Sequence, residues 1–574
     1  MRKLIFLLVA LLCASSVKAF YYNNLYFYPT SDGCEVRGFA PDYVLPTAVN
    51  LHIPSYAYDE DGNRYKVTAI ADKAFMGHVE IVQLFIPSTV ETIGSQAFSS
   101  CVSLVALSLY PSTRTIGESA FFGCLSLTSL NTSAEVVGAE AFRGCIALSA
   151  VNLGAPMKYI EPGAFMGCSI LTNIDIPHSV ERIGDAPGYT NRNGVFEDCL
   201  SLKSVTFAYN LSKEKPSIKT LGSNTFKNCV DLTSLDFPYS LTTVYENAFL
   251  RCTSLKQLDW GGPNTLRVYP VDLSGVKLQE IVCHGNVNWD NTKNLQSLTE
   301  LETVQYDTYA TEVQSRLFAN IPSLKNVYLY NAATIKSYAF NNCTGLQNLM
   351  LSPDLEQIEA GAFTGCTSLA DIKFGSKVTA IADCLGNSGI RTLTIPDNVT
   401  SLALPSNCSM LTTVTIGNGV QYCANGSFAG CTSLNTVHYG SRVTAVNLSP
   451  ASVRLITCAN PIPPTARNFH SEVYQNCTLV VPVGAAEAYR KAQYWKNFSR
   501  IIESDDAAVD DISIDDVAID ISECNISVQS GNPVSVYTTE GKLVLRLPAG
   551  RHTVSVTHGI YVLVTGKTVR KILI

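Results

Sequence analysis

Ten cysteines recur in one frame, Phe-x-x-Cys-x-x-Leu, often at intervals of 23 residues. They are Cys101, Cys124, Cys145, Cys168, Cys199, Cys229, Cys252, Cys343, Cys366 and Cys431. Thiols can ligate metals, attack substrates or form disulfides, but each of these reactions needs particular partners nearby. The sequence has no Cys-x-x-Cys, His-Glu-x-x-His or Gly-x-Ser-x-Gly motif, and its eight histidines are scattered. We therefore predict no catalytic, cofactor-binding or metal-binding site, and no enzyme activity.

The residues after each cysteine indicate the element that holds it. The frame continues as Leu-x-x-Φ-x-Φ, where Φ is apolar, as in Leu171, Ile174 and Ile176. This period-two ending predicts a strand with one buried face, and a proline such as Pro177 often ends it. One coil of this length cannot bury its own apolar side, whereas stacked coils share a continuous core. We predict a mainly β solenoid of about 15–16 coils with parallel neighbouring strands.

Within such a coil, each cysteine is expected to face inward at the turn and to pack as a small apolar residue with a weak S–H donor. His78 and Ile321 replace it in two copies of the frame. Disulfides are the alternative, because adjacent coils lie near bonding distance. A ladder of equivalent thiols has no natural pairing, so the alternative stays open mainly for Cys458 and Cys477, which lie outside the frame.

The full repeat resembles the BspA-like leucine-rich repeat proteins, whose repeat reads L-x-x-I-x-I-P-x-x-V-x-x-I-G-x-x-A-F-x-x-C-x-x-L. The stretch "LTNIDIPHSVERIG", followed by "VFEDCLSL", matches it closely. The resemblance implies a leucine-rich-repeat solenoid over 66–457, an N-terminal β cap over 20–65 and a C-terminal cap over 458–503 with a helix near 484–500. It also implies a secreted or surface protein of a Gram-negative bacterium that adheres to host extracellular-matrix or cell-surface proteins.

The two ends of the chain carry other signals. Residues 1–19 combine Arg2 and Lys3 with an apolar run and a small-residue cleavage site, which predicts a signal peptide. No later run is long and apolar enough for a membrane span.

Nine acidic residues and no basic ones lie between Glu503 and Glu523, which indicates an acidic linker or edge strand over 504–523. The chain shows no basic patch that would favour nucleic acid.

Residues 524–574 alternate as short strands with glycine turns, which predicts a small β-sandwich. The pieces "VSVYTTEGKLV", "GIYVLV" and "KILI" resemble the C-terminal sorting domain of type IX secretion cargo. This second resemblance implies that the secretion machinery is a partner of the C-terminal domain.

The fourth residue after each repeat leucine must point outward, because the third and fifth point inward. This row contains Ser108, Asn131, Asn152, Asp175, Thr206, Asp236, Asp259, Tyr328, Met350, Lys373, Thr394, Thr415 and His438. Its middle is acidic and aromatic, so we predict a binding surface at Asp175, Asp236, Asp259 and Tyr328.

His178 and His438 are expected to be ordinary surface residues. The competing function is a structural surface or spacer protein without a dedicated ligand, for which a face of only Ser, Thr and Asn would be typical.

Overall fold

The computed structural model describes residues 18–185, 193–207, 218–260, 266–269, 273, 275–289, 292–306, 310–423 and 428–504, and the backbone of seven strands between 517 and 573. The chain divides into two compact units, 1–311 and 312–574, and each is described by itself. Strands dominate both units, which confirms the predicted mainly β class. The solenoid has about 17 turns. This number is close to the predicted 15–16 coils.

The first unit begins with a mostly antiparallel group of strands. These are β1 (Phe20–Tyr22), β2 (Leu25–Thr30), β3 (Gly33–Phe39), β5 (Tyr56–Tyr58) and β6 (Arg64–Ile70). The pairs β1–β2, β2–β3 and β5–β6 are antiparallel, whereas β3–β6 is parallel. β6 then pairs in parallel with β8 (Thr92–Ile93), so this group is continuous with the repeats. It occupies the region where the sequence predicts an N-terminal cap.

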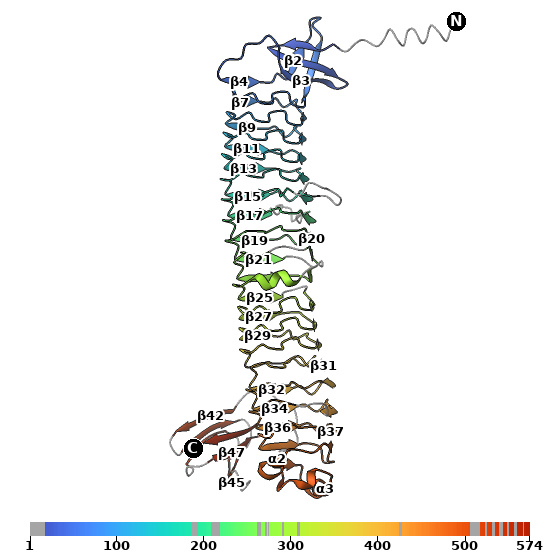
Figure 1. Cartoon of the computed structure of the whole chain (residues 1–574), viewed down its shortest axis with the longest axis vertical. Helices are drawn as coiled ribbons and strands as arrows, with labels where there is room; N and C mark the ends of the chain where they lie inside the picture. Colours follow the sequence, from blue (N-terminus) through green and yellow to red (C-terminus); the bar gives the residue numbers. More distant parts are fainter. Residues whose placement is uncertain are drawn as a thin grey trace, which may run out of the picture. The chain divides into compact units, whose positions relative to one another are not determined.

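Each later coil of the first unit supplies a longer and a shorter strand, and most of these strands pair in parallel with their counterparts in the next coil (Figure 1). The longer strands are β4 (Val49–His52), β7 (Ile81–Phe85), β9 (Ala106–Ser108), β11 (Ser129–Thr132), β13 (Ala150–Leu153), β15 (Asn173–Ile176), β17 (Ser204–Phe207), β19 (Ser234–Asp236), β21 (Gln257–Trp260), β23 (Glu280–Cys283) and β25 (Thr303–Tyr306). The outer surface of these strands is called the long-strand face below.

The shorter strands continue the sheet that begins with β6 and β8. They are β10 (Thr115–Ile116), β12 (Val136–Val137), β14 (Tyr159–Ile160), β16 (Arg182–Ile183), β18 (Thr220–Leu221), β20 (Thr243–Val244), β22 (Leu266–Val268) and β24 (Val287–Trp289). A 3₁₀ helix, η1 (Thr292–Ser297), lies between β24 and β25. Equivalent repeat positions are paired in register, as Ile116 with Val137. A residue type repeated in the sequence therefore becomes a column in the fold.

One such column is a stack of phenylalanine rings inside the coils. In the first unit it runs through Phe75, Phe98, Phe121, Phe142, Phe165, Phe196, Phe226 and Phe249, with successive ring centroids 5.2–6.4 Å apart. Phe318, Phe340 and Phe363 form the same stack in the second unit. The rings are buried and nearly parallel, so each coil covers the apolar face of the next.

The ten frame cysteines form the column beside the rings, and all ten are fully buried. Nine of them donate S–H to the phenylalanine carbonyl of the preceding coil, as Cys145 Sγ does to Phe121 O at 3.3 Å. Cys431 instead lies beside Cys408, whose thiol donates to Leu385 O at 3.1 Å. None of the seventeen cysteines that the structure describes forms a disulfide, and Cys458 and Cys477 are also free and buried.

The longer strands of the second unit are β27 (Asn326–Leu329), β29 (Asn348–Met350), β32 (Thr392–Ile395), β34 (Thr413–Ile416), β36 (Thr436–Tyr439), β38 (Leu455–Cys458), β40 (Thr478–Val481) and β41 (Arg500–Glu503). Its shorter strands are β26 (Glu312–Val313), β28 (Thr334–Ile335), β30 (Gln357–Ile358), β31 (Ala380–Ile381), β33 (Ser401–Leu402), β35 (Tyr422–Cys423), β37 (Ala445–Val446) and β39 (Thr465–Ala466). The pairing is again parallel.

Helical structure in the region predicted as a C-terminal cap is shorter than expected. It consists of α2 (Ser471–Asn476), α3 (Ala486–Lys491) and the 3₁₀ helix η2 (Trp495–Asn497). The single helix expected near 484–500 ends at Lys491 because the backbone is extended at Ala492 (φ −74°, ψ 142°), and Tyr494 then has a φ of 68°. Trp495 is fully buried and its Nε1 donates to Pro464 O at 2.7 Å, so this aromatic residue serves packing.

Seven C-terminal strands form two antiparallel sheets. They are β42 (Val517–Ser522), β43 (Asn525–Ser530), β44 (Val534–Thr538), β45 (Leu543–Leu547), β46 (Gly550–Ser555), β47 (Ile560–Thr565) and β48 (Thr568–Leu573). The strand orders are β42-β43-β46 and β45-β44-β47-β48. The end of the acidic segment thus forms an edge strand, while 505–516 lie outside the described residues. Packing of the two sheets as a sandwich stays a prediction.

Candidate binding surface

The long-strand face displays the outward row that the sequence predicts. In β15, Ile174 and Ile176 are buried while Asp175 between them is exposed. The register aligns Asp236 of β19 with Asp259 of β21, so two of the predicted acidic residues are direct neighbours. The row position of Asp175 in β15 pairs with Thr206 of β17, whose hydroxyl donates to the Asp175 carboxylate. Tyr328 is half-buried on β27 in the second unit.

A histidine beside the outward row contacts one of its acidic residues. His284 follows β23, and its Nε2 lies 2.9 Å from Asp259 Oδ1. The ring of Tyr239 contacts the His284 ring edge-on, with centroids 5.9 Å apart. His284 is outside the outward row in the sequence frame, because its coil has neither Phe nor Cys at the expected positions. Asp259 is therefore already paired, whereas Asp236 is exposed.

One expected surface residue is less exposed than predicted. His438 occupies an outward position of β36, but it is half-buried between Thr415 of β34 and Thr457 of β38. Burial disfavours its charged form and lowers its pKa to about 4. The outward direction was right, but the neighbouring strands cover much of the side chain. His178 is likewise half-buried after β15.

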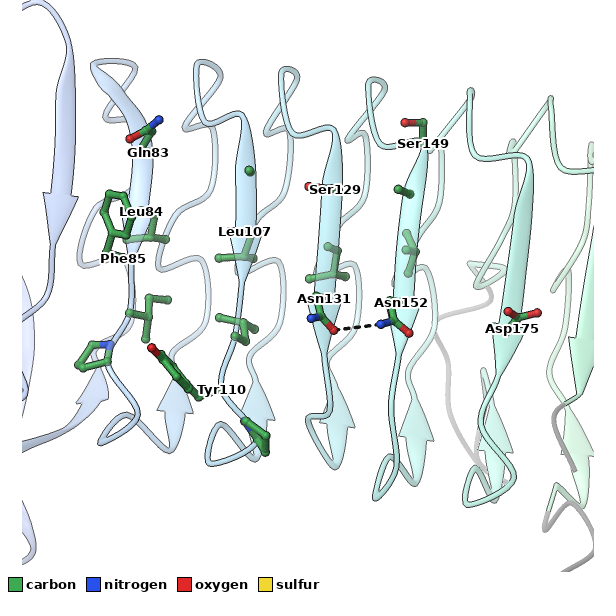
Figure 2. A pocket seen from close by; sticks show the side chains of 18 of the residues that line it. Gln83, Leu84, Phe85, Leu107, Tyr110, Ser129, Asn131, Ser149, Asn152 and Asp175 are labelled. Atoms are coloured by element: carbon green, nitrogen blue, oxygen red, sulfur yellow. Dashed lines mark hydrogen bonds between the residues drawn. The ribbon is translucent and has the colours of Figure 1, made fainter. Parts of the chain in front are cut away.

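A groove on the long-strand face was not predicted from the sequence. A groove of about 1070 Å³ crosses β7, β9, β11, β13 and β15 (Figure 2). Its floor includes the small residues Ala106, Ser129 and Ala150, which lie side by side in register. Because larger outward residues precede and follow them, the face is hollowed where these small residues occur.

The groove has an aromatic end and an amide-rich end. Phe85 and Tyr110 are 47% and 52% exposed, and His52 stacks on Phe85 with ring centroids 4.2 Å apart. Farther along, Asn152 Nδ2 donates to Asn131 Oδ1 at 3.3 Å, and Asp175 follows on the next strand (Figure 2). Phe85 holds the same outward position as Asp175. It was missed because the row was counted from the repeat leucine, and this coil has Ile81 in that place.

A row of exposed aliphatic residues borders the long-strand face at the turn before each longer strand. We call it the aliphatic row, and its members are Val79, Leu125, Ile146, Ile170 and Leu200, each 43–50% exposed. Four of them directly follow the frame cysteine or its His78 substitute, and Ile170 lies one residue later. In the second unit, Thr344, Thr367 and Thr432 hold the same position and are exposed.

Within the described ranges, no group of three or more His, Cys, Asp or Glu side chains could hold a metal ion. In the same part of the chain, no helix is long and apolar enough to cross a membrane.

The repeats, their parallel strands and their inward cysteines are those of a leucine-rich-repeat protein. The family model described as the BspA type leucine rich repeat region matches residues 68–191, 189–288, 291–404, 333–449 and 403–480, and the chain belongs to this family. This confirms the family predicted from sequence. Members of this family and fold are typically non-enzymatic, and they are typically secreted or surface proteins.

Solved structures of similar proteins include a leucine-rich repeat protein from Bacteroides ovatus. It is 23% identical, covers 74% of this chain and 95% of its own, and has a TM-score of 0.38. A leucine rich cell surface protein from Faecalibacterium prausnitzii is 19% identical, with 74% and 96% coverage and a TM-score of 0.30. No curated protein matches the chain.

Proposed function

We propose that this chain is a secreted or cell-surface, adhesin-like binding protein that contacts host extracellular-matrix or cell-surface proteins. The observation that carries the proposal is the aliphatic row along the first unit. Exposed apolar side chains gathered in one place favour a contact surface, because their burial against a partner is favourable. With neighbouring coils about 4.8 Å apart, the row presents a continuous apolar edge.

The repeat itself does not require this row. The second unit carries threonine at the equivalent positions and still forms the buried Phe and Cys columns. The leucine and isoleucine residues at 125 and 146 are therefore unnecessary for folding of a coil. Their retention on the surface is what a binding function explains.

The acidic residues Asp175, Asp236 and Asp259 belong to the same proposal. They lie on the long-strand face beside the aliphatic row, and a partner with basic residues would gain from them. Tyr328 is proposed as a further contact on the second unit. An apolar edge next to a polar, charged surface is the usual composition of a protein interface.

The alternative is a structural or spacer role, and one observation favours it for part of the molecule. In the second unit, β32 and β34 present Thr392, Thr394, Thr413 and Thr415 in register on their outer surface. Such a uniform polar face is typical of a spacer. The contrast between the two units favours binding by the first.

Export also belongs to the proposal. Residues 1–17 lie outside the described residues, but the proposed cleavage site directly precedes β1, whose Phe20 is buried and stacks on Phe27 at 5.6 Å. Cleavage there leaves the first strand intact. The C-terminal strands are proposed to engage a type IX-like secretion machinery, so deletion of 524–574 should keep the protein cell-associated.

The test measures capture of the mature protein by decellularised host matrix and by cultured host cells. The double variant Leu125→Ser/Ile146→Ser should reduce apparent affinity by about tenfold or more, because two apolar contacts are lost. The matched control Thr344→Ser/Thr367→Ser changes the equivalent positions of the second unit and should bind normally. Absence of capture, or equal capture by both variants, would instead support the spacer role.

A further inference from the structure

The groove across β7–β15 is chemically different from the aliphatic row. At one end it presents the exposed aromatic rings of Phe85 and Tyr110. The stacking of His52 against Phe85 restricts how that ring can turn. An aromatic face combines a large apolar area with a negative π-surface, so it suits a ligand with polarised C–H groups on a flat face. Pyranose rings are ligands of this kind.

The groove also supplies hydrogen-bonding side chains. Gln83, Asn131, Asn152 and Asn173 are exposed amides on four different strands. Each amide offers donors and an acceptor in one plane, which matches the paired hydroxyls of a sugar ring. The bond between Asn131 and Asn152 orients both amides before a ligand arrives. From β11 to β15, a ligand crossing the strands would meet such a group about every 4.8 Å.

The charge of the lining limits the ligand class. Of the described residues that line the groove, Asp175 is the one with a formal charge, and neither lysine nor arginine lines it. A sulfated or otherwise anionic chain would therefore find no counter-charge, and Asp175 would repel it. The lining favours an uncharged ligand.

The backbone of the groove excludes the usual mode of peptide capture. An extended peptide binds a sheet by pairing with the free edge of a strand. Here, β9 pairs with β11, β11 pairs with β13, and β7 pairs with β4, so the backbone groups of these strands face their neighbours. Across β4 to β13, side chains therefore form the surface of the groove. A ligand that binds through side-chain stacking and amide contacts fits this surface better than a peptide does.

We infer that the groove binds an uncharged glycan chain, running across the strands from Phe85 and Tyr110 toward Asp175. The aromatic rings stack against sugar faces, the asparagines bind hydroxyls, and the floor of Ala106, Ser129 and Ala150 leaves room for the rings. This glycan site does not require the protein partner proposed above, because it uses different residues from the aliphatic row.

Affinity gel electrophoresis of the mature protein tests the inference with four probes: a β-glucan, an α-mannan, a galactan and desialylated mucin O-glycans. At least one should retard the protein. The variants Phe85→Ala and Tyr110→Ala should each weaken that binding by up to about tenfold, the loss expected for one stacking contact. Tyr422→Ala removes a ring that is 68% exposed in the second unit, and it should bind like the unchanged protein. Heparin, as an anionic chain, should not bind.

Three results would overturn the glycan assignment: no retardation by any of the four probes, retardation that survives loss of both aromatic rings, or preferential binding of heparin. Thermal melting of each variant shows whether it folds, and Asn131→Ala/Asn152→Ala provides a second test without aromatic changes. Capture by deglycosylated matrix separates the two proposals. If that capture persists without glycan binding, only the groove inference fails, whereas glycan binding without capture contradicts the proposed protein adhesion.

Discussion

A buried thiol is well suited to the repeat because it meets two requirements in little space. The turn needs a small apolar side chain beside the phenylalanine stack, and the carbonyl of the preceding phenylalanine needs a donor. Cys145 provides both, with its sulfur 3.3 Å from Phe121 O. Where no equivalent coil precedes, at the first copy of the frame, the structure has His78, whose ring packs edge-on against Phe39 at 4.9 Å.

Burial gives these thiols a pH dependence that can be measured. It raises the pKa of Cys145 to about 12, and the pKa of Cys101, Cys252 and Cys343 to about 12 as well. In an unfolded chain the value is about 8.5. Below pH 8.5 both states are protonated and the thiols add no slope. Between about pH 8.5 and 12 only the unfolded chain loses protons, so stability should fall by about 1.4 kcal/mol per pH unit for each thiol.

The variant Cys145→Ser separates this effect from other alkaline titrations. At neutral pH it should cost about 1–3 kcal/mol, because a hydroxyl in this apolar position lacks equivalent contacts. It should also reduce the alkaline slope, since serine does not titrate there. Denaturant midpoints at pH 7 to 11 measure both, with the exposed Ser149→Ala as control. An unchanged slope, or fast alkylation of the native thiols at pH 8, would contradict the inward ladder.

At the scale of elements, parallel stacking converts repeat positions into surface rows. The turn before each shorter strand of the first unit shows this with alternating charge, as Glu91, Arg114, Glu135, Lys158, Glu181 and Lys219. Successive members belong to adjacent coils, because the carbonyl of each accepts from the backbone N–H of the next member or, for Arg114, from that of Val136 beside Glu135. Opposite charges one strand apart attract weakly and like charges would repel. The alternation therefore favours the observed register.

The three aspartates on the long-strand face lead to a prediction about how binding depends on salt concentration. Asp175→Asn/Asp236→Asn/Asp259→Asn should weaken capture by matrix or cells, because a basic partner loses attraction. It should also flatten the decrease of binding with salt. Asp231→Asn, at an exposed turn off the row, is the matched control. Circular dichroism checks folding, since the change at Asp259 removes its contact with His284. Unchanged capture and an unchanged salt response would show that the acids only keep the face soluble.

At the scale of the whole molecule, the repeats build the solenoid of a BspA-type protein, and the ends are proposed to determine where it goes. Antiparallel strands at the start and an aromatic cluster near Trp495 lie beyond the regular repeats. Exposed edges of parallel strands would otherwise pair with other chains. The acidic segment then separates the repeats from the C-terminal strands.

The export proposal predicts the N-terminus of the secreted protein. Mass spectrometry of secreted material should find Phe20 as the first residue, because Val17 and Ala19 are small residues at the recognised positions before it. Ala19→Phe places a bulky residue at the cleavage site and should block processing. A secreted protein that still begins at Met1 would contradict the signal peptide.

The sequence by itself determined the repeating unit. Period-two alternation and the Phe-x-x-Cys-x-x-Leu frame gave the strands, their parallel stacking, the buried cysteines and the outward direction of Asp175 and Asp236. These features depend on interactions within a coil or between equivalent positions of adjacent coils. Because the same pattern is repeated many times, local irregularities do not obscure it.

Only the tertiary structure decided what surrounds each outward residue. His438 and Asp175 have the same position in the repeat, yet the first is half-buried and the second is exposed, because their neighbours on adjacent strands differ. The groove arises from three small residues on consecutive strands, and Asp259 meets His284 from a coil without the frame. Alternation along one strand fixes the direction of a side chain. How deeply that side chain is buried, which residues it contacts and where the surface is hollowed depend on side chains that are about 20–30 residues away in the sequence.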